Sequence, residues 1–325
     1  MPQPSADLPT GSPSGFALGE PSWLDADDGH RLAWWQGGSA SGVPLLLLHG
    51  GPGGQTRPES VALWHGLPVR WIAFDQRGCG RSEPAGETRH NTLDALLGDI
   101  ERLRAALGIE RWALAAGSWG ALLALACLRR EPSRVRALFL RSPFTGSRAE
   151  VERYLAPWFD WLGAAGRAAL GGDADALPRL FQGTTARHAE TAIGGEALLA
   201  DAWSRFDDAQ SQPGGVAARA ARWSVPAQPA APAPAWRVFG HYAAHGWFLE
   251  RPLVEALPAR SSWCGPLGLV HGALDACCDP ATSRALARWH GAADHVEVAE
   301  GGHRMAQPAM ATALRAAAER WLARI

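Results

Sequence analysis

The stretch "ALAAGSWGALLAL" (residues 113–125) places a single hydroxyl, that of Ser118, inside an otherwise apolar run. The residues before it have the length and composition of a buried strand, and those after it continue as a buried helix. Gly117 and Gly120 flank the serine, where a sharp strand-to-helix turn brings backbone close to backbone. The pattern predicts a turn that holds Ser118 at the edge of a sheet as a nucleophile, although alone it also fits a helix N-cap.

The surrounding segments predict the sheet to which this turn belongs. Continuous apolar runs of strand length recur along the chain, at residues 43–50, 69–78, 111–118 and 135–142. Residues 91–108 lie between two of them and carry a helical apolar stripe, with Thr92 as N-cap and Gly108 as the stop. Residues 22–38 read as a hairpin around Asp28 and Gly29. This alternation predicts an α/β fold with a mostly parallel sheet flanked by helices.

The pattern of strands and helices divides the chain into three parts. Residues 1–21 are rich in Pro, Ser and Gly and are expected to form a flexible tail. We expect an α/β core from residues 22–145 and 259–325. The strand signal disappears over residues 146–258, which predicts an inserted helical cap, interrupted by the Pro/Ala stretch 224–235.

Composition excludes several classes of function. The formal net charge is −1, so no global positive field is present to attract nucleic acid or anionic lipid. No apolar stretch has the roughly 20 residues that a membrane-spanning helix needs. The five cysteines are odd in number and lack paired C-x-x-C spacing, which favours free thiols over disulfides or a zinc site. Without a secretory signal pattern, a cytoplasmic location is expected.

The loop "HGGPGG" (residues 49–54) follows the first apolar run and gives the turn at Ser118 a chemical context. Its glycines let the amide of Gly51 face the serine. Together with the amide of Trp119, which opens the following helix, it forms a candidate oxyanion hole.

A nucleophilic serine also needs a base and a carboxylate that orients the base. Asp275 ends the apolar run "LGLVHGALD", and His303 follows the last predicted strand in "GGH". The order serine, acid, histidine is the one expected for this turn on an α/β sheet. His271 lies within a strand and is expected to be a packed, hydrogen-bonded histidine.

With these residues in place, the chain resembles the α/β-hydrolase superfamily and, within it, the proline iminopeptidases. The similarity extends from about residue 23 to the C-terminus. Its most specific carrier is "DQRGCGRS" (residues 75–82), where we expect Asp75 and Arg77 to form an ion pair that ties loops together. Further carriers are the segments "DGHRLAWW", "HGGPGG", "GSWG", "AWSRFDDA", "RVFGHY" and "HGALDACCDP".

The resemblance implies an exopeptidase that removes an N-terminal proline, using a helical cap to bind the proline ring and its ammonium. In the segments "AWSRFDDA" and "RVFGHY" it assigns substrate contacts to Trp203, Phe206, Asp207, Phe239 and Tyr242. Among these, Asp207 is the candidate anchor for the ammonium. The implied partners are small peptides with a free N-terminus, with neither nucleic acid nor membrane, and the oligomeric state is left open.

The chain departs from the family's pattern at specificity positions. Phe239 stands where the family has a second amine-binding glutamate, and Asp207 is one methylene shorter than the usual glutamate. Ala273 replaces an arginine two residues before the catalytic acid, whereas Cys278 matches a family cysteine near the pocket. Fewer anions attract an ammonium less strongly, so a broader or different substrate remains open.

The predicted chemistry is acyl transfer by Ser118, His303 and Asp275, and it requires no metal or organic cofactor. One alternative is a hydrolase of esters or non-prolyl amides that uses the same three residues. A second alternative is a catalytically silent binding protein that retains the α/β-hydrolase fold.

Overall fold

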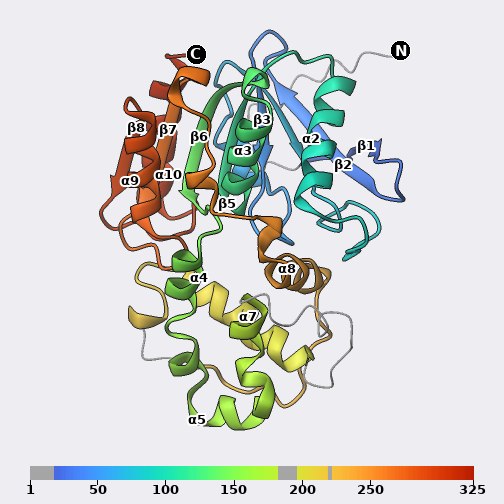
Figure 1. The fold of residues 1–325 in the computed structure, drawn as a ribbon, viewed down its shortest axis with the longest axis vertical. Helices are drawn as coiled ribbons and strands as arrows, with labels where there is room; N and C mark the ends of the chain where they lie inside the picture. Colours follow the sequence, from blue (N-terminus) through green and yellow to red (C-terminus); the bar gives the residue numbers. More distant parts are fainter. Residues whose placement is uncertain (1–17, 182–195, 219–221) are drawn as a thin grey trace.

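The computed structural model describes residues 18–181, 196–218 and 222–325, so that residues 1–17 of the predicted tail lie outside it. Eight strands form one sheet in the order β1-β2-β4-β3-β5-β6-β7-β8 (Figure 1). Their bounds are Ser22–Asp25 (β1), Arg31–Gly38 (β2), Val43–Leu48 (β3), Val69–Phe74 (β4), Trp112–Ser118 (β5), Val135–Pro143 (β6), Leu267–Gly272 (β7) and Asp294–Val298 (β8).

Strand directions confirm the predicted mostly parallel sheet. Only β2 runs against its neighbours, pairing antiparallel with β1 and β4, and every other pair of neighbours is parallel. The hairpin predicted over residues 22–38 is formed by β1 and β2, with Asp25 opposite Arg31.

Helices cover the sheet and also form a separate group between β6 and β7. Those beside the sheet are α1 (Pro58–Ala62), α2 (Leu93–Ala106), α3 (Trp119–Arg130), α9 (Pro280–His290) and α10 (Pro308–Leu322). The group between β6 and β7 comprises α4 (Arg148–Leu155), α5 (Trp158–Leu170), α6 (Ala176–Phe181), α7 (Glu196–Gln210) and α8 (Pro234–Ala244). Short 3-10 turns span Pro132–Arg134, Gly171–Asp175, Val216–Ala218, Gly246–Phe248, Leu253–Glu255 and Arg260–Ser262.

We call the described residues from α4 to α8 the helical lobe; none of them is in a strand. In Figure 1 the lobe lies beyond the carboxyl ends of the parallel strands. The Pro/Ala stretch has no helix from residue 222 to residue 233, as expected from its prolines, and α8 begins at Pro234.

The alternation of side chains along each strand builds two apolar layers. In β3, Leu46 and Leu48 pack into the layer under α2, α3 and α9, whereas Leu45 and Leu47 pack into the layer under α1 and α10. All four side chains are buried, as expected for a strand with helices on both faces. The sheet is therefore a rigid platform whose exposed chemistry is confined to its loops.

Local sequence signals fix α2 as predicted. The Thr92 hydroxyl accepts a hydrogen bond from the amide of Ala95, which satisfies one unpaired donor of the first turn. Gly108 follows the last turn with φ +65°, the left-handed conformation that favours glycine after a helix.

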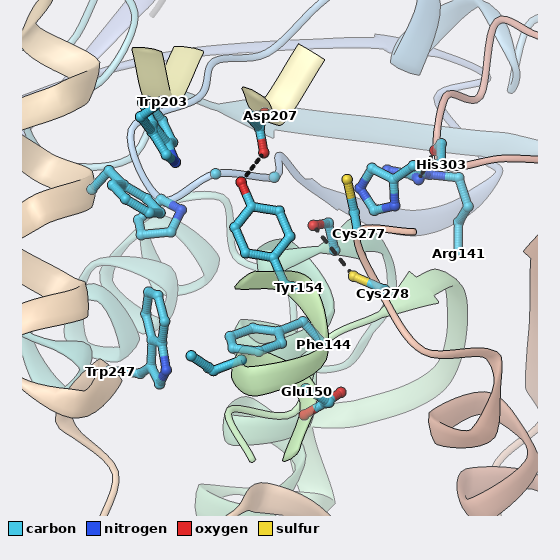
Figure 2. A pocket seen from close by; sticks show the side chains of 16 residues that line it. Arg141, Phe144, Glu150, Tyr154, Trp203, Asp207, Trp247, Cys277, Cys278 and His303 are labelled. Carbon is cyan, nitrogen blue, oxygen red and sulfur yellow. Dashed lines mark hydrogen bonds between the residues drawn. The ribbon is translucent and has the colours of Figure 1, made fainter. Parts of the chain in front are cut away.

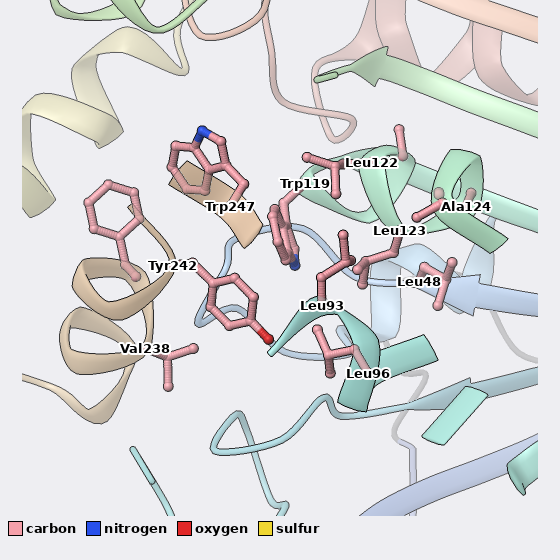
Figure 3. Close-up of a cluster of buried hydrophobic side chains, with 14 of the residues drawn as sticks. Leu48, Leu93, Leu96, Trp119, Leu122, Leu123, Ala124, Val238, Tyr242 and Trp247 are labelled. Carbon is pink, nitrogen blue, oxygen red and sulfur yellow. The ribbon is translucent and has the colours of Figure 1, made fainter. Parts of the chain in front are cut away.

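Aromatic packing fixes the helical lobe to the core next to the turn at Ser118. Trp119, the first residue of α3, packs edge-on against Tyr242 of α8, with ring centroids 4.9 Å apart (Figure 3). The Tyr242 hydroxyl donates a hydrogen bond of 2.7 Å to the side-chain oxygen of Asn91, which precedes α2. Both aromatic rings are about 1% exposed, so α8 is firmly attached to the core.

The predicted ion pair between Asp75 and Arg77 is wrong, because Arg77 pairs with other carboxylates. Arg77 donates to both carboxylate oxygens of Asp99, at 2.5 and 2.8 Å, and to Asp28 at 2.5 Å. Asp75 instead accepts hydrogen bonds from two backbone amides of neighbouring loops. The correct partners are far apart in sequence and meet because the β1–β2 loop, the loop after β4 and helix α2 come together here.

Breaking the buried pair should destabilise the protein. We expect Asp99→Asn to lower the free energy of unfolding by about 3–5 kcal/mol, because it leaves a buried guanidinium without its main counter-charge. Urea unfolding followed by circular dichroism measures the loss. As a control, Glu152→Gln removes an exposed pair with Arg148 and should change stability little. Equal effects of the two substitutions would contradict the assignment.

Candidate active site

Five loops meet at the carboxyl edge of the sheet, where ligands bind in open α/β folds. They follow β3, β5, β6, β7 and β8, and face a cavity of about 210 Å³ between the core and the helical lobe (Figure 2). The core contributes Gly50, Gly51, Pro52, Ser118, Arg141, Phe144, Cys277, Cys278 and His303 to its wall. The lobe contributes Glu150, Val151, Tyr154, Trp203, Asp207 and Phe239, and Trp247 follows α8.

The turn at Ser118 is strained and depends on both flanking glycines. Ser118 ends β5 with φ 56° and ψ −126°, an unusual backbone conformation for a residue with a side chain. A Cβ atom on Gly117 would lie 2.4 Å from the Arg141 guanidinium. One on Gly120 would lie 2.3 Å from the backbone oxygen of Leu48. The sequence therefore places glycine where neighbouring strand ends leave no room for a side chain.

The glycine-rich loop after β3 also owes its composition to close approach. Gly51 has φ +133°, which a residue with a side chain rarely adopts. A Cβ atom on Gly53 would lie 2.4 Å from the backbone oxygen of Ala235, at the start of α8. The loop is therefore packed between the turn at Ser118 and the helical lobe, with Gly51 in the cavity wall.

A hydrogen-bond network through Gln76 joins this loop to the turn. The Gln76 amide donates to His49 Nε2 at 3.0 Å, and its side chain donates to the His49 carbonyl at 2.9 Å. The side-chain oxygen of Gln76 accepts from the Trp119 indole at 2.9 Å. Because Nε2 accepts, the proton of His49 is on Nδ1, which donates to the Gly50 carbonyl at 2.8 Å. His49 therefore supports both parts of the candidate oxyanion hole while it is neutral.

Asp275 and His303 form a hydrogen-bonded pair at the cavity. His303 Nδ1 donates to Asp275 Oδ2 at 2.8 Å, and the amides of Cys277 and Cys278 donate to Oδ1 at 2.9 Å each. Burial would raise the pKa of Asp275, but the charge of His303 and hydrogen bonds from His303 and His271 outweigh burial and hold it well below its usual value. The ionised carboxylate fixes the His303 proton on Nδ1, so Nε2 is free to act as a base.

His271 is a packed, hydrogen-bonded histidine, as expected. Its side chain is fully buried; Nδ1 accepts from the Ser283 hydroxyl at 2.7 Å, and Nε2 donates to the Cys278 carbonyl at 3.2 Å. Nε2 also lies 3.5 Å from Asp275 Oδ2, where it adds to the stabilisation of the carboxylate.

Close backbone contacts and Arg141 position the loop of His303. A Cβ atom on Gly272 would lie 2.3 Å from the Gly301 carbonyl oxygen, and one on Gly302 would lie 2.7 Å from the amide nitrogen of Pro213. The Arg141 guanidinium, at the end of β6, donates to the His303 carbonyl. Burial lowers the pKa of Arg141, although nearby Asp275 opposes that shift.

Ser118 and His303 line the same cavity, but no hydrogen bond between their side chains is present among the described residues. The Ser118 hydroxyl lies 3.9 Å from the sulfur of Cys278, at the limit of a weak hydrogen bond. Serine–histidine hydrogen bonds are often long in ligand-free sites and shorten when substrate binds. Burial raises the pKa of both Cys277 and Cys278 well above the usual value, so these thiols are protonated and poor nucleophiles.

The lobe contributes two carboxylates and an aromatic wall to the cavity. Glu150 accepts hydrogen bonds from the Thr145 and Ser147 amides and the Thr282 hydroxyl. Asp207 accepts a hydrogen bond of 2.9 Å from the Tyr154 hydroxyl (Figure 2). Burial raises the pKa of Asp207, although the hydrogen bond from Tyr154 and the nearby His303 oppose that shift. Trp203 and Phe239 stack with centroids 4.1 Å apart and ring planes 25° apart. The side chain at position 239 therefore extends the apolar wall where the family resemblance predicts a carboxylate.

Two of the predicted substrate contacts are not in the cavity wall. Phe206 is fully buried inside the lobe, where it packs edge-on against Trp158 and Tyr154 at 5.2 Å each. Tyr242 is buried in the contact with Trp119 described above. The family resemblance placed both residues at the substrate, whereas the packing of the lobe directs Phe206 into its own interior and Tyr242 against Trp119.

Other residues of the wall were not predicted. Arg141 follows an apolar run at the carboxyl edge of the sheet, and that position was a usable signal. Tyr154, Phe144 and Trp247 carried no local signal, since their place in the wall depends on how the lobe folds back onto the core.

A second, larger cavity of about 730 Å³ adjoins the first. The two share Gly50, Arg141, Asp207 and His303 as wall residues, whereas Ser118 lines only the first. His303 therefore borders both cavities.

The fold and this site define a class of protein with a serine on a strand-to-helix turn and a histidine–carboxylate pair at the edge of an α/β sheet. The family model described as "alpha/beta hydrolase fold" matches residues 43–305, and the chain belongs to that family. Among the described residues, no helix is long and apolar enough to cross a membrane.

Part of the chain is similar in sequence to curated proteins named proline iminopeptidase. A proline iminopeptidase of Xylella fastidiosa is 43% identical over 142 residues, which cover 44% of each chain. One from Arabidopsis thaliana is 38% identical over 167 residues, covering 50% of this chain and 42% of the relative. The matched segments thus span less than half of these relatives' length.

Solved structures match over nearly the whole chain. A proline iminopeptidase-related protein from Thermus thermophilus has a TM-score of 0.56 at 25% identity, covering 94% of this chain and 99% of that one. A thermophilic esterase from Thermogutta terrifontis has the same TM-score at 21% identity, covering 90% and 93%, which shows a shared fold alone.

The neutral state of His49 makes stability depend on pH. Burial lowers the pKa of His49 below its ordinary value of 6.5, although nearby Asp75 opposes that shift, so the unfolded chain binds the proton more readily. The stabilisation from His49 is complete above about pH 6.5 and is lost as the pH falls below it. We expect the stability difference between the wild type and His49→Asn to shrink as the pH falls, measured by urea unfolding. A difference independent of pH would refute this.

Proposed function

We propose that this chain is a serine hydrolase that releases N-terminal proline from peptides through an acyl-enzyme. The observation that carries the proposal is the hydrogen-bonded pair of His303 and Asp275 in one cavity with Ser118 on its strained turn. Similarity to proline iminopeptidases over part of the chain supports the choice of substrate.

In the proposed reaction, the Ser118 hydroxyl attacks the carbonyl of the first peptide bond and gives its proton to His303 Nε2. His303 then passes the proton to the leaving amine, and Asp275 stabilises the imidazolium that forms between these steps. Water then attacks the acyl-enzyme in the same way, with His303 as the base, and releases the acyl group from Ser118. The amides of Gly51 and Trp119 are assigned to the oxyanion, since a first-turn amide of a helix has no partner within it.

We assign the acyl group and the leaving group of the substrate to different cavities. We assign the proline ring to the first cavity, with its aromatic wall, and its ammonium to Asp207. An ammonium there favours the ionised form of a carboxyl whose pKa burial has raised. The rest of the peptide is assigned to the second cavity, because His303, which protonates the leaving amine, lines both.

A second candidate function is hydrolysis of esters or non-prolyl amides by the same residues. The stack of Phe239 on Trp203 favours it, because an apolar wall suits an uncharged acyl group better than an ammonium. The two candidates differ in whether a free amine on the substrate is required.

Removal of the nucleophile tests the reaction class. Ser118→Ala should lower kcat for prolyl arylamides by at least about 10⁴-fold and abolish labelling by a serine-directed phosphonate. Thermal unfolding should show that the variant remains folded. Full activity, or labelling that persists in the variant, would refute acyl transfer by Ser118, and an unlabelled wild type would favour a silent binding protein.

Substitution of Asp207 tests whether the enzyme recognises the free amine of the substrate. Asp207→Asn should lower kcat/KM for a free-amine prolyl arylamide by about 10–100-fold, the value of a hydrogen bond to a charged group, and leave the N-blocked substrate unaffected. Asp160→Asn is the matched control, since Asp160 is an exposed carboxylate of the helical lobe that lines neither cavity. Equal cleavage of free and blocked substrates by the wild type, with rapid ester hydrolysis, would instead support the second candidate.

A further inference from the structure

We infer that Cys277, His303 and Asp275 form a binding site for Zn²⁺, which blocks the site when bound. The thiol belongs to the loop after β7, and the imidazole to the loop after β8. The ion would act as an inhibitor of the proposed hydrolase and not as its cofactor. Zinc binding at this site does not depend on whether the chain catalyses the proposed reaction.

The donor set and its spacing suit zinc. Sulfur, nitrogen and carboxylate oxygen are its usual ligands. One ligand atom from each of the three residues lies within 4.8 Å of the other two. Ligands about 2.0–2.3 Å from a tetrahedral ion are about 3.3–3.8 Å apart. His303 Nδ1 and Asp275 Oδ2, now 2.8 Å apart, must therefore separate by about 0.5–1 Å, and the sulfur must approach them by at most about 1–1.5 Å. Figure 2 shows the Cys277 sulfur beside the His303 ring. The Cys277 amide is hydrogen-bonded to Asp275, and the His303 carbonyl to Arg141.

The donors are available to an ion. Among the described residues, the Cys277 sulfur has only one weak contact, 3.6 Å from the Ser211 hydroxyl, and it is a free thiol. Asp275 Oδ1 is held by two loop amides, which leaves Oδ2 directed at His303 as the ligand oxygen. Two amide donors orienting a carboxylate are the kind of outer support that metal ligands have in proteins.

The charges around the site favour a cation. The carboxylates of Asp275 and Asp207 both act on the Cys277 thiol, and Asp207 also acts on His303. The Arg141 guanidinium, which holds the His303 carbonyl, opposes them with a single positive charge. Two carboxylates therefore face one guanidinium, and a divalent ion compensates the excess negative charge.

Binding at these atoms would stop the proposed chemistry. Bound between Asp275 Oδ2 and His303 Nδ1, the ion replaces the proton of their hydrogen bond. The imidazole then carries its proton on Nε2, so His303 no longer acts as a base. Because the Cys277 thiol must lose its proton, zinc binds more tightly as the pH rises. The fourth ligand position stays open to water or to a substrate group.

The first test is isothermal titration of Zn²⁺ into the full chain and into two single-cysteine variants. We expect one site in the wild type, at least about tenfold weaker in Cys277→Ala and changed less than about twofold in the matched control Cys278→Ala. Circular dichroism checks the fold, and Cys277→Ser replaces the alanine variant if the latter does not fold. The proposed site is refuted if Cys277→Ala does not weaken zinc binding, or if Cys278→Ala weakens it equally.

A second readout separates this inference from the proposed function. Co²⁺ in place of zinc should give a thiolate-to-cobalt charge-transfer band in the wild type and in Cys278→Ala, and none in Cys277→Ala, whether or not the chain hydrolyses anything. If hydrolysis is found, Zn²⁺ should inhibit each protein relative to its own uninhibited rate, about tenfold less potently for Cys277→Ala. Zinc bound at Cys277 without inhibition would overturn the inhibitory role.

Discussion

The strained backbone of Ser118 is the constraint on which the rest of the site depends. A residue with a side chain keeps φ 56° only where its surroundings leave no relaxed alternative. Here the end of β3 lies against Gly120, and Arg141 of β6 lies against Gly117. The parallel sheet, buried on both faces, supplies the rigid frame that holds these strand ends together.

Close backbone contacts also bring Asp275 and His303 together. Gly272 and Gly301 bring the loops after β7 and β8 within contact, which lets Asp275 reach His303. A buried carboxylate would be costly unless it were fully hydrogen-bonded, and Asp275 receives two loop amides and an imidazole. These amides belong to Cys277 and Cys278, so the same hydrogen bonds fix the backbone of both cysteines beside the Asp275–His303 pair.

In our proposal, substrate specificity depends on a different part of the molecule. The helical lobe brings Tyr154, Asp207 and the Trp203–Phe239 stack to the cavity, and α8 is held by the contact of Tyr242 with Trp119. A change in the lobe therefore alters what binds without altering the proposed reacting groups. Phe239 is such a change, since an aromatic ring occupies the place of an expected carboxylate.

By itself the sequence determined the sheet, because buried parallel strands appear as continuous apolar runs and their glycines mark tight turns. It also identified Ser118, Asp275 and His303 as candidates, since each lies at or just after the end of a predicted strand, at an edge where parallel strands end together. Only the tertiary structure decided the partners of Arg77, the burial of Phe206 and Tyr242, and the approach of Cys277 to His303. These depend on which helix face turns inward and which loops meet, and both are set by packing between segments far apart in the chain.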